Sequence, residues 1–211
     1  MADPTMTGRY RDHHPRLPSP PPERIEPPPE RPAWQLLLIP MLVGGLVALT
    51  LGVYGNVHDG TGVAVNLAGF QNHPAPTSAV KVTLSTGALG FAVLQILTAL
   101  IMYGKVPGVA AADWSGTAHR WSGRLAFLCA VPVGIHCLYA AGFQSYDGRI
   151  FLHSLVGCLF FGAFTVKMLG LRKDGMPGWF LPVLGGSLFT GLVAVWWTTA
   201  IRFFENFGSP I

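Results

Sequence analysis

Five long apolar stretches constrain the fold more than any other feature of this sequence. They cover residues 34–54, 80–103, 117–142, 150–169 and 179–204. Each is close to the roughly 20 residues that an α-helix needs to cross a hydrocarbon core about 30 Å thick. Every backbone polar group must be satisfied inside a bilayer, and stretches this long without strand-like alternation therefore predict helices. We expect an all-α membrane protein with five transmembrane helices over residues 33–205.

Composition agrees with a membrane protein. Of the 211 residues, 50% are hydrophobic and only 11% are charged, whereas an ordinary soluble domain carries about 25% charged residues. The three cysteines all lie in apolar stretches and form no C-x-x-C pair, which argues against a disulfide scaffold or the usual iron–sulfur spacings. The net charge of +4 comes from scattered basic residues that flank apolar spans, so we do not expect nucleic-acid binding. Any chemistry must take place between helices.

Residues 1–32 differ from the rest of the chain. They contain ten of the eighteen prolines among charged residues, a composition typical of a disordered tail that is partly polyproline II. The tail lacks the features of a cleavable signal peptide. We expect it to be solvated, with docking to a proline-binding module as the alternative.

The distribution of Lys and Arg predicts the orientation. With the N-terminus in the cytoplasm, eleven of these residues lie on the cytoplasmic side and three outside, a clear positive-inside bias. The 56–79 loop, the 143–149 turn and the C-terminal residues 206–211 then face outward. We expect a multi-pass protein of the plasma membrane, in contact with lipid.

Two histidines are the strongest candidates for chemistry, because an ionisable side chain at membrane depth is costly and usually functional. His136 lies six residues before Gly142, where the third helix is expected to end, and His153 lies six residues after Asp147, which is expected to cap the fourth. At about 1.5 Å per residue, both lie about 9 Å from the same turn. Two imidazoles at one depth on antiparallel helices match the needs of six-coordinate haem iron, and we predict His136 and His153 as metal ligands.

Glycines stand beside two of the histidines. His119 is followed four residues later by Gly123, and His153 by Gly157. Residues four apart share a helix face, so each glycine leaves room for a flat macrocycle beside its histidine. Close helix packing is the alternative explanation. Zinc, calcium and magnesium are disfavoured, since no acidic residue lies in the middle of a span.

Other residues have less definite roles. His119 is a second, inner haem ligand, or a donor to a propionate or quinone together with Arg120 and Arg124, or an interfacial histidine in a basic cluster. Arg149 is a salt-bridge partner for a haem propionate or an interfacial anchor. The loop histidines, His58 and His73, are expected to be solvated, although His73 could help to receive an electron at an outer haem edge.

The segment from His119 to Arg124, followed by His136 and His153, resembles the histidine-bearing helices of cytochrome b561-like and ferric-reductase-like membrane haem proteins. The whole chain, with its proline-rich tail, also resembles an actinobacterial family of small five-helix membrane proteins. The first resemblance implies a four-helix haem-binding bundle made from the second to fifth helices, with haem b held by His136 and His153. Those families carry more histidines in this region than this chain does, so we expect one haem, with two as the alternative.

The sequence thus predicts a membrane b-type cytochrome subunit. It would carry electrons between an extracytoplasmic redox partner and a quinone or another membrane redox protein. Because no flavin or nicotinamide site is present, we expect it to act as the electron-transfer subunit of a larger oxidoreductase. Two alternatives are a scaffold, assembly or transporter subunit without haem, whose histidines bond across the bundle, and a quinone- or lipid-binding subunit.

Overall fold

The computed structural model describes residues 32–110 and 112–210, and this part of the chain is all helical. Its elements are α1 (Ala33–Val57), α2 (Pro76–Met102), α3 (Asp113–His136), a short π-helix η1 (Cys137–Ala141), α4 (Gly148–Gly170) and α5 (Phe180–Phe207). The predicted all-α class is confirmed, and when α3 and η1 are taken together each predicted span differs from its helix by at most four residues at either end. The predicted tail, except for its last residue, lies outside the described residues.

All five long helices are long and apolar enough to cross a membrane. Large apolar side chains also point outward from the bundle, including Leu49 at 64% exposure and Leu128 at 65%. Exposed apolar surface along whole helices is what lipid contact requires. The structure is therefore compatible with a multi-pass membrane protein.

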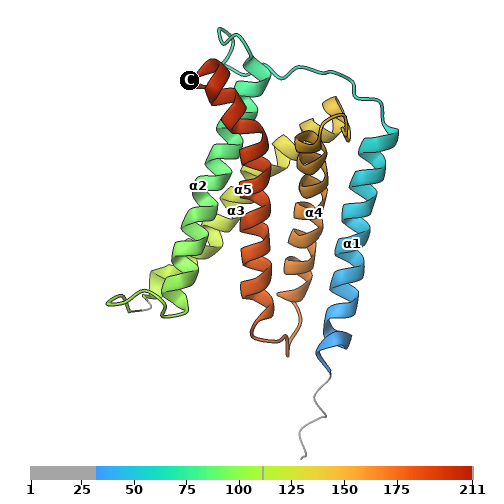
Figure 1. The fold of residues 1–211 in the computed structure, drawn as a ribbon. Helices are drawn as coiled ribbons and strands as arrows, with labels where there is room; N and C mark the ends of the chain where they lie inside the picture. Colours follow the sequence, from blue (N-terminus) through green and yellow to red (C-terminus); the bar gives the residue numbers. More distant parts are fainter. Residues whose placement is uncertain (1–31, 111, 211) are drawn as a thin grey trace, which may run out of the picture. The chain divides into compact units, whose positions relative to one another are not determined.

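Helix neighbours do not follow chain order. α1 packs on α4, α4 packs on α5, and α5 packs on α2, which in turn packs on α3. The loop between α1 and α2 runs across one end of the bundle to join two helices on opposite flanks (Figure 1). The α2–α5 contact buries Ala79, Val82, Ala200 and Phe203.

Two glycines allow α1 and α4 to approach closely. A Cβ added to Gly44 would overlap Val166 and lie 2.6 Å from the carbonyl oxygen of Gly162, and one added to Gly162 would lie 2.6 Å from the carbonyl oxygen of Gly44. Small residues at such a crossing are the usual way for membrane helices to gain packing contacts.

Aromatic side chains join α3 to α4. The rings of Phe127 and Phe164 stack with centroids 4.0 Å apart, and Phe161 meets Phe127 edge-on. Phe161 also occupies the space beside Gly134, where a Cβ would lie 2.6 Å from its ring. α3 and α4 are therefore in contact through aromatic rings.

The turn between α3 and α4 carries both signals that the sequence predicted. Gly142 follows η1 with φ +72°, a conformation that favours glycine. Asp147 caps α4, its side chain accepting a hydrogen bond from the backbone N–H of Arg149 at 3.2 Å. The π-helical turn begins five residues after Pro132, which remains inside α3. π-helical turns are frequent at functional sites.

Candidate functional site

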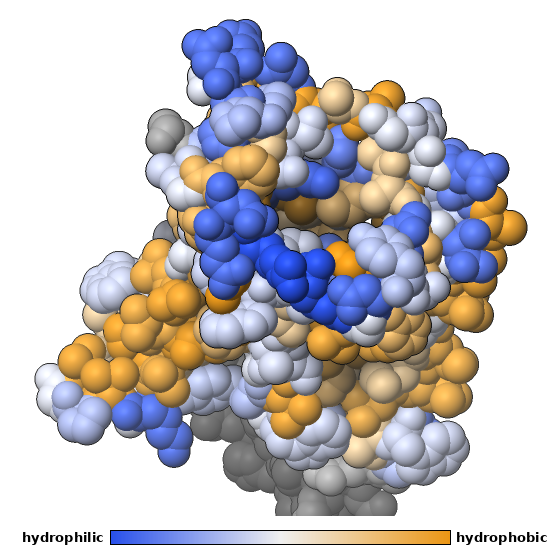
Figure 2. All heavy atoms as spheres, turned by 45° about the horizontal axis from the view of Figure 1, so that its top comes forward, coloured by the Kyte–Doolittle hydropathy of each residue, from blue (hydrophilic) through white to orange (hydrophobic). Residues whose placement is uncertain are grey.

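A cavity of ≈ 290 Å³ lies between α3 with η1 on one side and α4 with α5 on the other, and α2 closes its flank. We call the end of the bundle at which it lies the η1 end. Figure 2 shows a hollow at this end, with hydrophobic side chains inside it and hydrophilic ones along part of its rim. The cavity wall is mostly apolar and includes Ala88, Ala130, Val133, Phe160, Phe161 and Leu192. An apolar pocket with few polar groups is the usual form of a small-molecule site, although this one is at the lower end of the usual size.

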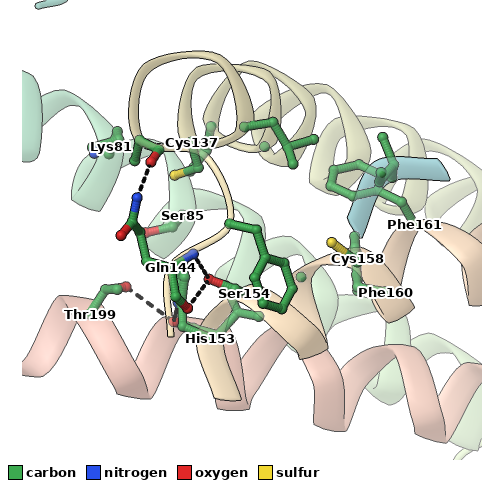
Figure 3. Close-up of a pocket in the computed structure, with 18 of the residues that line it drawn as sticks. Lys81, Ser85, Cys137, Gln144, His153, Ser154, Cys158, Phe160, Phe161 and Thr199 are labelled. Atoms are coloured by element: carbon green, nitrogen blue, oxygen red, sulfur yellow. Dashed lines mark hydrogen bonds between the residues drawn. The ribbon is translucent and has the colours of Figure 1, made fainter. Parts of the chain in front are cut away.

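His153 lines this cavity from α4 (Figure 3). Its Nδ1 lies 3.0 Å from Oγ1 of Thr198 and 3.2 Å from the carbonyl oxygen of Val195, both on α5. The Thr198 hydroxyl already donates its hydrogen to carbonyl oxygens of its own helix at 2.9 Å. Both partners can therefore only accept from Nδ1, so this nitrogen carries the proton. Nε2 of a neutral His153 ring then has a free lone pair.

The polar groups along the cavity wall are largely satisfied by the protein. The hydroxyls of Ser85 and Thr199 donate to carbonyl oxygens of their own helices. The Gln144 side chain donates to the carbonyl oxygen of Ala141 at 2.6 Å, and the Ser154 hydroxyl bonds to both backbone groups of Gln144. Gln144 thereby ties the end of η1 to the first turns of α4. These groups stabilise the wall instead of offering themselves to a ligand.

Two nitrogen atoms in the wall have no such partner. Within the described residues, Nε2 of His153 makes no hydrogen bond, and Nζ of Lys81 makes neither a hydrogen bond nor an ion pair. Lys81 is half-buried on α2. From its nitrogen atoms the cavity thus offers a ligand one lone pair and one ammonium group, beside the Tyr146 hydroxyl and the free thiols of Cys137 and Cys158.

His136 lies beside this cavity and does not line it. Its neighbour Cys137 is in the wall, and successive helix residues point about 100° apart. Nε2 of His136 bonds to the carbonyl oxygen of Val63 at 2.9 Å, while its Nδ1 is buried without a partner. The structure therefore does not bring His136 and His153 together in one cavity wall, and their pairing on one iron stays a prediction.

The loop that holds His136 also covers η1. The backbone N–H groups of Thr61 and Gly62 donate to the carbonyl oxygens of Tyr139 and Ala140 at 3.2 and 3.0 Å. Carbonyls that a π-helical turn leaves free are thereby satisfied by the loop.

His119 occupies a comparable position at the opposite end of the bundle. Its Nδ1 lies 3.0 Å from Oγ1 of Thr98 on α2, and its carbonyl oxygen accepts a hydrogen bond from the side chain of Gln95. The Thr98 hydroxyl donates to the Leu94 carbonyl oxygen at 2.8 Å, so it too can only accept from the histidine. His119 does not line the cavity that contains His153.

The two predicted glycines have different surroundings. Gly157 lines the cavity, and a Cβ added there would meet nothing within 4 Å. Gly123 packs against α2, because an added Cβ would lie 2.8 Å from Nε2 of Gln95. Of these two residues, only Gly157 stands beside open space.

The predicted arginines are engaged within the protein. Arg149 donates through one guanidinium N–H to the carbonyl oxygen of Thr198, and its Nε lies 3.8 Å from a carboxylate oxygen of Asp147. The Arg124 guanidinium lies over the Trp121 ring, 5.1 Å from its centroid, a cation–π contact. Neither arginine lines the cavity.

The loop histidines are packed and not simply solvated. His58 stacks between the rings of Tyr54 and Tyr139, and its Nε2 is buried without a partner. His73 accepts a hydrogen bond from the backbone N–H of Ala75 and stacks on Phe203 of α5. Both side chains therefore hold the α1–α2 loop against the bundle.

Sequence reasoning missed Lys81, Thr98 and Thr198. Lys81 is one of the three basic residues that the charge distribution places outside, although its position one residue inside the second apolar stretch already marks a costly cation. The threonines have no signal in the sequence, because their role depends on how neighbouring helices are rotated. Among the described residues, no three His, Cys, Asp or Glu side chains group together as a metal site.

Residues 37–211 match the model of a family of unknown function, DUF6529, and the chain belongs to that family. No curated protein and no solved structure matches the chain.

Proposed function

We propose that this protein is a membrane b-type cytochrome subunit, which carries electrons between an extracytoplasmic redox partner and a quinone or another membrane redox protein. The observation that carries the proposal is His153 in the wall of an apolar cavity, with its Nδ1 proton held by α5 and its Nε2 free. Metal-binding histidines nearly always donate their other ring N–H to a carbonyl or similar acceptor, which fixes the ring and raises its basicity.

The residues fit a haem on the α4 side of the cavity. His153 would be an axial ligand, and Gly157 leaves open space one turn further along the same helix. On the α3 side the fit is less direct, because Nε2 of His136 is bonded to Val63 outside the cavity wall. A ligand larger than the cavity would extend through its mouth at the η1 end.

Bound haem would supply one-electron transfer. Thr198 and Val195 would hold the His153 ring in one tautomer and orientation, and Phe160, Phe161 and Leu192 would exclude water. A dry, apolar surrounding is one of the means by which a protein sets a haem potential. The positive-inside distribution of Lys and Arg supports an outward-facing η1 end, and thus an electron partner outside the cytoplasm.

The test is the visible spectrum of the detergent-purified full chain, oxidised and then reduced with dithionite, with a pyridine haemochrome to count haem per chain. We expect sharp reduced α and β bands and one haem. His153→Ala should lose the haem, whereas the matched control His73→Ala should keep it. His136→Ala distinguishes a bis-histidine site, which would lose its low-spin spectrum, from a site that His153 holds alone.

A colourless wild-type protein from cells supplied with haem would overturn the proposal, and so would full haem content in His153→Ala. One observation favours a scaffold without haem instead: His119, His136 and His153 each bond to a group on another helix or loop. Polar side chains often join membrane helices in this way. A colourless protein that unfolds more readily when these histidines are replaced would support that function.

A further inference from the structure

Lys81 is a cation without a counterion in the wall of the cavity. It lies five residues after the start of α2, within a helix long and apolar enough to span a membrane. Such a residue is expensive unless it has a partner or a function. Within the described residues, one ion pair joins Arg149 to Asp147, and no carboxylate pairs with Lys81.

The position of Lys81 is defined by its neighbours. It lines the cavity from α2, together with Cys137 of η1 and His153 of α4 (Figure 3). Lys81 and His153 therefore face one space from two different helices.

The unsatisfied groups of the cavity define a complementary ligand. Such a ligand has an apolar body, a group that accepts the lone pair of His153, and an anionic substituent for the ammonium of Lys81. Haem has all three, since its propionates are carboxylates on an apolar macrocycle whose iron takes an axial ligand. Arg149, the propionate partner expected from the sequence, is already engaged by Thr198 and Asp147 and is absent from the wall.

We propose that Lys81 binds the carboxylate of the molecule that fills this cavity and so fixes which way round the molecule enters. This inference rests on the proposed function, because the molecule is taken to be haem. Lys81 is a positioning residue: it would orient the haem edge toward the η1 end by a charge-assisted hydrogen bond, while His153 would hold the iron.

The test compares haem b with haem b dimethyl ester, in which both propionates are esterified and carry no charge. Each is added to full-length protein purified from haem-limited cells, and its loss to an excess of apomyoglobin is followed by absorbance. Wild type should release the ester about tenfold faster than haem b, because the ester cannot pair with a cation. Lys81→Gln should release both at the same, faster rate, and Lys81→Arg should recover the wild-type preference.

Arg202→Gln is the matched control, since it removes an exposed positive charge from α5 near the same end of the bundle. It should keep the wild-type preference for haem b. A wild type that binds both compounds without preference, or a Lys81→Gln protein that keeps the preference, would overturn the role of Lys81 and leave the cytochrome proposal intact. A wild type that binds neither compound would overturn both.

Discussion

Nδ1 of His119 lies 3.0 Å from Oγ1 of Thr98. At the opposite end of the bundle, Nδ1 of His153 lies 3.0 Å from Oγ1 of Thr198. In both pairs the threonine hydroxyl donates within its own helix and can only accept from the ring. The α2–α3 and α4–α5 pairs are thus each joined by an imidazole whose protonated nitrogen is specified by the neighbouring helix.

The two threonines should differ in their contribution to stability. In Thr98→Val, Nδ1 of His119 loses its partner, whereas in Thr198→Val, Nδ1 of His153 keeps the Val195 carbonyl oxygen at 3.2 Å. We expect Thr98→Val to lower the free energy of unfolding by about 1 kcal/mol and Thr198→Val by less. Unfolding in detergent titrations, followed by circular dichroism, measures both. A larger loss in Thr198→Val would contradict this assignment of partners.

The crossing of α1 and α4 can be tested with two adjacent glycines. Gly44 is in contact with α4, whereas a Cβ on Gly45 would meet nothing within 4 Å. Gly44→Leu should therefore destabilise the protein by about 1–3 kcal/mol through overpacking. Gly45→Leu adds the same atoms to open space and should leave the unfolding midpoint near that of wild type. If both variants behave alike in a detergent titration, α1 does not pack on α4 as described.

A larger side chain in the cavity wall should abolish haem binding without unfolding the protein. Gly157 lines the cavity with open space at its Cβ, so Gly157→Val should fold and should exclude a bound haem. Gly186→Val is the control, because Gly186 is also helical and open but lies outside the cavity wall. We expect haem per chain to fall to near zero in the first variant only. Equal haem content in the two proteins would place the haem somewhere other than this cavity.

The contact between His136 and Val63 should hold the covering loop on η1. In His136→Leu, the hydrogen bond to the Val63 carbonyl oxygen is lost, while Thr61 and Gly62 keep their backbone bonds to η1. Backbone amides near Val63 should then exchange with deuterium faster, whereas amides in the middle of α5 should not change. Unchanged exchange around Val63 would show that the bond does not restrain the loop.

Local signals explain what the sequence predicted well. Helix existence follows from apolar length, and the turn after α3 follows from Gly142 and Asp147, whose effects depend only on neighbouring residues. The equal depth of His136 and His153 follows from axial rise alone. Axial rise says nothing of helix rotation, and rotation is what directs His136 toward Val63 while Cys137 faces the cavity. The partnership of α1 with α4 likewise depends on distant parts of the chain.

That partnership affects the order of assembly during synthesis. α1 leaves the ribosome first, yet the surface around Gly44 that it buries is completed only when Gly162 has been made, more than a hundred residues later. Until then this apolar helix can be stable only in lipid or against the insertion machinery. The first helix would thus remain an independent anchor, and the docking of α1 onto α4 would be a late, long-range step in the maturation of the bundle.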